Sequence, residues 1–119
     1  MANDLLIDPE AIENLRALNP DDGDAFLRDI VGIFLEDTPL RLAELRESLQ
    51  LNDQVRFTRA AHSIKGSASN LGAAQLRLAA ERLEHHSRQS LQNVDDLLSD
   101  LDARFAATRG ELERIVPPV

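Results

Sequence analysis

One histidine has neighbours whose types and spacing suit phosphoryl chemistry. Lys65 follows His62 by three residues and Gly66 follows it by four, so on a helix all three lie on one flank. Helical side chains lean toward the N-terminus, so a side chain at position 66 would lie across His62, and Gly66 leaves the imidazole open. Lys65 leans back toward the same ring. An open imidazole beside an ammonium group is a candidate site for an anion or a covalent phosphoryl group.

The residues around His62 are predicted to form one helix. Its apolar stripe recurs at three- and four-residue steps, as in an amphipathic helix, and comprises Phe57, Ala61, Ile64, Ala68 and Leu71. At about 100° per residue, His62 lies on a flank that faces away from this stripe. The helix should end near Asn70, where Gly72 suits a left-handed C-terminal position. Gly66 costs a helix on the order of 1 kcal/mol relative to Ala, so it serves another purpose; the alternatives are access to His62 and close helix packing.

The N-terminal half is also predicted to be helical. Asp8 is a helix cap and Pro9 a first helical residue, and this short helix should end before the turn sequence at residues 19–23. A long helical pattern then runs from residue 24 to residue 50. Pro39 lies within it and either kinks one helix or starts a second one.

Two further helices complete the predicted fold. They extend from Ala73 to about Arg88 and from Val94 to Ile115, and the connections are short. Short connections favour antiparallel neighbours. We therefore predict an all-α fold, an antiparallel four-helix bundle with a short additional N-terminal helix, as a single domain over residues 1–119 with a core over about 8–116.

Composition excludes several classes of function. The chain has no Cys, which rules out thiol catalysis and thiolate metal sites and is compatible with a reducing cytoplasm. The net charge of -8 argues against a nucleic-acid partner. No apolar run approaches the roughly 20 residues of a membrane span, and the start lacks the basic flank of a signal peptide. His85 and His86 are adjacent and point about 100° apart, so they are read as surface residues rather than a metal pair.

The motif around His62 resembles a known family. Residues 61–67 (Ala-His-Ser-Ile-Lys-Gly-Ser) with residues 71–73 (Leu-Gly-Ala) resemble the histidine-containing phosphotransfer (HPt) domains of bacterial multistep phosphorelays. Residues 33–39 and 80–84 resemble the flanking helices, and the resemblance covers about 8–115. It implies that His62 accepts a phosphoryl group from the aspartyl phosphate of one receiver domain and passes it to another. Lys65 would then neutralise the phosphoryl oxygens, and Gly66 would be the family's small residue.

The resemblance also implies partners and limits. The expected partners are response-regulator receiver domains and a hybrid sensor kinase, with no nucleic acid or membrane, and the protein is expected to be a cytoplasmic monomer. No Gly-rich phosphate loop is present, so autonomous kinase activity is not expected. No cofactor is expected on this chain, because the Mg²⁺ would belong to the receiver. Some relatives carry Gln or Arg near the position of Glu84. A carboxylate there would bond an imidazole but repel a phosphoryl group, so that role is not carried over.

Candidate partner-binding residues surround His62 and continue onto the long helix. Thr58 and Ser69 flank His62 by helical geometry, and Arg59 with Lys65 forms a local basic spot. Val31 and Leu35 belong to a second apolar stripe, which is either a docking surface or buried beneath the first helix. Two other functions compete with phosphotransfer. One is a helical adaptor that binds receivers or other partners without being phosphorylated. The other is a metal-binding bundle, which is disfavoured because no Glu-x-x-His motif appears.

Overall fold

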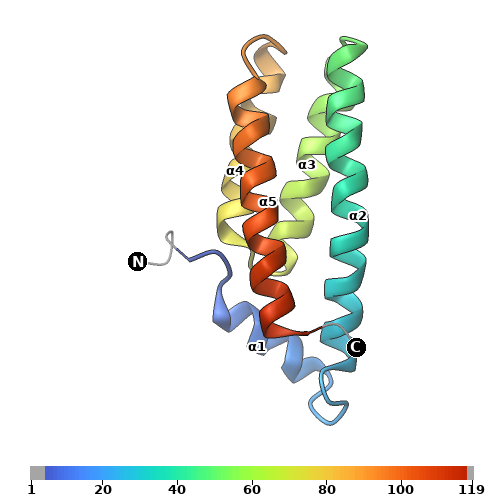
Figure 1. Ribbon diagram of the computed structural model, residues 1–119, viewed down its shortest axis with the longest axis vertical. Helices are drawn as coiled ribbons and strands as arrows, with labels where there is room; N and C mark the ends of the chain where they lie inside the picture. The colour runs from blue at the N-terminus through green and yellow to red at the C-terminus, as the bar shows by residue number, and fades with distance from the viewer. Residues whose placement is uncertain (1–4, 118–119) are drawn as a thin grey trace.

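The fold is a bundle of long helices closed at one end by a short one. The computed structural model describes residues 5–117, and this part contains five helices, namely α1 (Pro9–Leu18), α2 (Ala25–Gln50), α3 (Gln54–Asn70), α4 (Ala74–Gln89) and α5 (Asp95–Ile115). Helices α2 to α5 lie side by side along the long axis, and α1 lies across the end where α2 begins and α5 ends (Figure 1). The predicted fold class is confirmed. No helix in this part of the chain is long and apolar enough to cross a lipid bilayer.

The start of α1 is set by the predicted cap. The Asp8 carboxylate accepts a hydrogen bond from the Glu10 backbone N–H at 3.0 Å, and Pro9 is the first helical residue. Ile7 and Ile12 are buried on either side of the cap. A helix of this length is marginal alone, so burial of these two side chains helps to hold α1 against the bundle.

Helix α2 is continuous through Pro39, so the alternative of a second helix starting there is wrong. The apolar side chains of α2 differ widely in exposure. Val31 is only 4% exposed, so the alternative of a docking surface is wrong for this residue. Leu35 packs partly buried against the core, and its part in docking stays a prediction. Ile33, in contrast, is 66% exposed. The reason is that α2 contacts α1, α3 and α5, so a single helical stripe does not mark its buried face.

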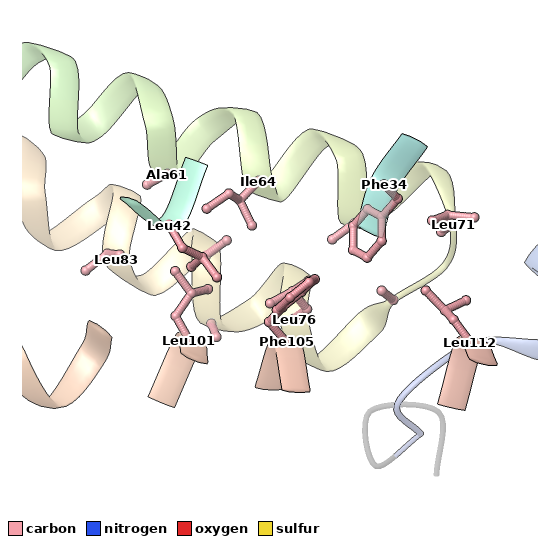
Figure 2. Close-up of a cluster of buried hydrophobic side chains, with 14 of the residues drawn as sticks. Phe34, Leu42, Ala61, Ile64, Leu71, Leu76, Leu83, Leu101, Phe105 and Leu112 are labelled. Atoms are coloured by element: carbon pink, nitrogen blue, oxygen red, sulfur yellow. The ribbon is translucent and has the colours of Figure 1, made fainter. Parts of the chain in front are cut away.

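The core confirms the predicted stripe of α3. Phe57, Ala61, Ile64, Ala68 and Leu71 are each at most 1% exposed. Figure 2 shows Ala61, Ile64 and Leu71 facing apolar side chains of the other long helices, among them Phe34, Leu42, Leu76, Leu83, Leu101, Phe105 and Leu112. Burying one such side chain contributes about 1.5–3 kcal/mol. This stripe fixes the rotation of α3 about its axis and therefore turns His62 outward.

The turn between α3 and α4 depends on Gly72. Its φ of 69° lies in the left-handed region, as predicted. A Cβ at this position would also overlap Ala11 Cβ and lie 3.3 Å from Asp8 Cβ. The Gly72 carbonyl accepts a hydrogen bond from the Asp8 backbone N–H at 2.8 Å. Gly72 therefore allows α1 to approach the turn closely enough to bond to it.

Candidate functional site

His62 lies on the exposed flank of α3. The helix begins at the predicted cap, where the Asp53 carboxylate accepts a hydrogen bond from the Arg56 backbone N–H at 3.1 Å. The apolar stripe of α3 faces inward, and the His62 side chain on the other side of the helix is 63% exposed. A docking protein can therefore reach the imidazole without any movement of the bundle.

Glu84 of α4 holds one nitrogen of the imidazole. His62 Nδ1 lies 2.8 Å from Glu84 Oε2, and Glu84 is only 2% exposed. An ionised carboxylate can only accept hydrogen bonds, so in the neutral ring the proton sits on Nδ1 and the lone pair on Nε2. Nε2 has no hydrogen-bond partner among residues 5–117. The nitrogen with the free lone pair is thus the one left open to a partner.

Two cations bind the same carboxylate. Lys65 Nζ lies 2.6 Å from Glu84 Oε1, and Arg88 Nη2 lies 2.8 Å from Glu84 Oε2, the oxygen that also accepts from His62. The Lys65 side chain is 27% exposed and that of Arg88 is 61% exposed. Lys65 therefore lies beside His62, as the spacing suggested, but its ammonium group is bonded to Glu84.

Glu84 is ionised at neutral pH. Burial opposes its ionisation, but the hydrogen bonds from Lys65 and His62 outweigh this effect and hold the pKa of the carboxyl below its ordinary value. A folded-state pKa below the unfolded value adds stability above the unfolded pKa, and this stability is lost as the pH falls through the folded value. The charge of Glu84 is therefore part of the site throughout the neutral range.

Gly66 faces open space. A Cβ built at this position would meet no heavy atom within 4 Å, so the alternative that Gly66 permits close helix packing is wrong. Ala would also fit, whereas a longer side chain would extend over the turn that carries His62. Access to the imidazole is the alternative that stays a prediction for this helix-weakening residue.

The residues predicted around His62 form one side of a shallow groove. The groove has a volume of about 510 Å³ and is lined by Thr58, Arg59 and His62 with Gln54, Val55, Glu84 and Arg88. Thr58 Oγ1 lies 2.7 Å from Ser87 Oγ, so it is directed toward α4. Arg59 is exposed and has no acidic partner within ion-pair distance in the described range 5–117. Val31 and Leu35 do not line the groove.

Other predicted surface residues lie outside this groove. Ser69 is exposed, and its hydroxyl donates a hydrogen bond to the Lys65 carbonyl at 3.0 Å. His85 is exposed, and His86 Nε2 lies 2.7 Å from the Gln92 carbonyl oxygen. Within residues 5–117, no three His, Asp or Glu side chains gather in a way that could hold a metal ion.

Arg88 is the charged residue bonded to Glu84 that sequence reasoning missed, and Gln54 and Val55 are groove residues that it also missed. The available signal for Arg88 was its position four residues after Glu84, since residues at that spacing are neighbours on one face of a helix. The sequence left the role of Glu84 open, because its contact with His62 joins residues 22 positions apart.

Comparison with known proteins places the chain among phosphotransfer proteins. The family model described as "Hpt domain" matches residues 29–115. Multistep phosphorelay regulator 1 of Schizosaccharomyces pombe is 28% identical over 93 residues, which cover 78% of this chain and 31% of that protein. The chain thus spans about a third of the length of that curated relative.

Solved structures share the fold over nearly the whole chain. Histidine-containing phosphotransfer protein B from Pseudomonas aeruginosa PAO1 superposes with a TM-score of 0.83 and 27% identity, covering 92% of this chain and 93% of that one. A histidine-containing phosphotransfer protein from maize gives a TM-score of 0.78 at 21% identity, covering 93% of this chain and 87% of that one. The likeness to the maize protein concerns the fold alone.

Proposed function

This chain belongs to the Hpt domain family of phosphorelay intermediates, and from that premise we propose that His62 carries the phosphoryl group. The observation that carries the proposal is the orientation of the ring. His62 Nδ1 is bonded to a buried carboxylate, while the opposite nitrogen has no hydrogen-bond partner within residues 5–117 and the residue lines the groove. An imidazole with a free lone pair is a competent nucleophile at neutral pH.

The transfer is a displacement at phosphorus. Nε2 of His62 attacks the phosphorus of an aspartyl phosphate on a receiver domain, and an N–P bond forms as the P–O bond breaks. The receiver carboxylate leaves with the electron pair. A second receiver takes the group by the reverse displacement, in which its aspartate attacks and Nε2 leaves. Catalysis of this kind rests on positioning and on positive charge around the phosphoryl oxygens.

The charges of this chain suit that role. Lys65 and Arg88 contribute two positive charges beside His62 and Glu84 one negative charge, which sum to +1. A phosphoryl group adds about −1.5 to −2, so the excess positive charge offsets much of it. We assign Lys65 a double role, holding Glu84 and supplying charge to the phosphoryl group, and Arg88 shares the second part.

The partners we propose are receiver domains, including that of a hybrid sensor kinase. Hpt proteins are phosphotransfer carriers rather than kinases, so the Mg²⁺ and the nucleotide chemistry are assigned to the partners and no cofactor to this chain. The protein carries a net charge of -8, yet Arg59, Lys65 and Arg88 surround His62. We propose that this basic rim, with Thr58 and Ser69, meets the acidic phosphorylation pocket of a receiver. The cysteine-free composition fits action in the cytoplasm, and we propose a monomer.

Incubation with a phosphorylated cognate receiver tests the proposal. Transfer to this chain should give a label that is labile in acid and stable in base, as expected of a phosphohistidine. An unphosphorylated adaptor would bind the receiver and acquire no label. Binding without label would therefore reject the proposed function in favour of the adaptor.

Gly66→Gln is expected to slow the transfer about tenfold or more, because the new side chain leans over the imidazole and small misplacements of reacting groups are costly. The fold should be retained, and stability should rise by up to about 1 kcal/mol, since the Cβ enters open space and Gln is the better helix former. Stopped-flow or quenched-flow transfer kinetics beside thermal melts measure both effects.

Gly110→Gln is the matched control for this variant. Gly110 lies within α5, and a Cβ there also meets no heavy atom within 4 Å. Gly110→Gln should stabilise α5 without changing the rate of phosphoryl transfer. Equal transfer rates in Gly66→Gln and Gly110→Gln would show that Gly66 does not serve access to His62.

A further inference from the structure

Once the His62 ring is phosphorylated, the proton on Nδ1 affects how readily the N–P bond breaks. A neutral imidazole that attacks through Nε2 keeps its Nδ1 proton, so the immediate product bears phosphorus on Nε2, a proton on Nδ1 and a positive charge on the ring. Loss of that proton would give a neutral phosphorylated ring. The two forms differ in how readily the N–P bond breaks, because the first releases a neutral imidazole and the second must release an imidazolate anion.

We propose that Glu84 retains the Nδ1 proton on phosphorylated His62, so that the phosphoryl group stays ready to leave across the neutral pH range. This inference rests on the proposed function of His62. In each direction of transfer the N–P electron pair moves between phosphorus and Nε2. The proton remains between Nδ1 and Glu84 Oε2, which lie 2.8 Å apart. No proton has to enter or leave the site during the relay.

The charged groups around the ring support this assignment. Arg59 and Lys65 face it from α3, and Glu84 and Arg88 from α4, the two helices that line the groove. Only Glu84 favours a cationic ring, and it is the group in direct contact with Nδ1. The cations oppose ring protonation less than their number suggests, because Lys65 and Arg88 are bonded to Glu84 and the added phosphoryl group attracts them.

A carboxylate differs here from the Gln found in some relatives. The Gln amide oxygen can accept the same hydrogen bond, but it has no charge to stabilise the imidazolium. Hydrogen bonds to charged groups are roughly twice as strong as neutral ones. We therefore expect Glu84→Gln to lower the pKa of the phosphorylated ring by about one unit while leaving the position of His62 unchanged.

The test is the pH profile of phosphoryl transfer from the labelled full chain to an acceptor receiver. Wild type and Glu84→Gln should transfer at similar rates near pH 6. Near pH 8 the variant should be slower by about tenfold, which corresponds to the one-unit shift. Glu81→Gln is the matched control, because Glu81 lies on the same helix and pairs with Arg77, and its profile should follow that of the wild type. Parallel profiles for Glu84→Gln and wild type would overturn the inference.

A second measurement needs no variant. NMR titration of the phosphorylated His62 ring in the native protein and in urea compares the pKa of the ring with and without Glu84 beside it. The native value should be higher by about one unit, and an equal or lower value would overturn the inference. If wild-type His62 acquires no label at all, both the proposed function and this inference fail. A label with unshifted ring titration rejects only the role of Glu84.

Discussion

His62→Gln is expected to abolish phosphoryl transfer to this chain while leaving the bundle folded. Gln offers no nucleophilic nitrogen, so incorporated label should fall by at least about a hundredfold, to background. The side chain is 63% exposed, and its replacement leaves the apolar stripe of α3 intact. Label is measured after incubation with a phosphorylated receiver, and folding is measured by circular dichroism and thermal melts.

His85→Gln is the control for this experiment. His85 is exposed on α4 and does not line the groove, so this variant should acquire as much label as the wild type. Undiminished label in His62→Gln would reject His62 as the acceptor. Loss of label in both variants would indicate a general effect on receiver binding and not the loss of a nucleophile.

Gly72→Ala is expected to destabilise the protein by about 2–4 kcal/mol. The left-handed conformation costs a residue with a Cβ roughly 1–2 kcal/mol, and the overlap with Ala11 Cβ adds to this cost. Relief of the overlap requires α1 to move away from the α3–α4 turn, which lengthens the hydrogen bond from Asp8 to the Gly72 carbonyl. Urea or guanidinium denaturation gives the change in the free energy of unfolding.

Gly23→Ala separates the two causes. Gly23 also has a positive φ, of 62°, but a Cβ there meets no atom within 4 Å. Gly23→Ala should therefore lose only the stability that the left-handed conformation costs a residue with a Cβ. The difference in free energy of unfolding between the two variants then measures the effect of the close approach of α1. Equal destabilisation of both variants would mean that α1 does not pack tightly against Gly72.

The helices were predictable because their signals are local. Asp8 and Pro9 mark the start of α1, and the apolar stripe of α3 identifies its buried face, so both are read within a few residues of sequence. The burial of Val31, which the sequence left open, has a different origin. Helix α2 contacts α1, α3 and α5, and its buried surface depends on where those helices lie, which periodicity within α2 does not encode.

The part of the site that lies on α3 was predictable for the same reason, but its contacts with α4 were not. The positions of Lys65 and Gly66 relative to His62 follow from helical geometry on one helix. The bond between His62 and Glu84 depends on the rotation and height of α4 against α3, and therefore on the packing of the whole core. The same packing brings Arg88 to the ring and turns the Lys65 ammonium toward Glu84, features that no spacing within α3 could indicate.

The most direct measurement is the identity of the phosphorylated nitrogen. The protein, carrying ¹⁵N-labelled histidine and phosphorylated by its receiver, can be examined by NMR for one-bond coupling between ³¹P and ring nitrogen. We predict a single phosphorylated nitrogen, Nε2 of His62, with a proton retained on Nδ1. Coupling of phosphorus to Nδ1 of His62, or to either nitrogen of His85 or His86, would contradict it.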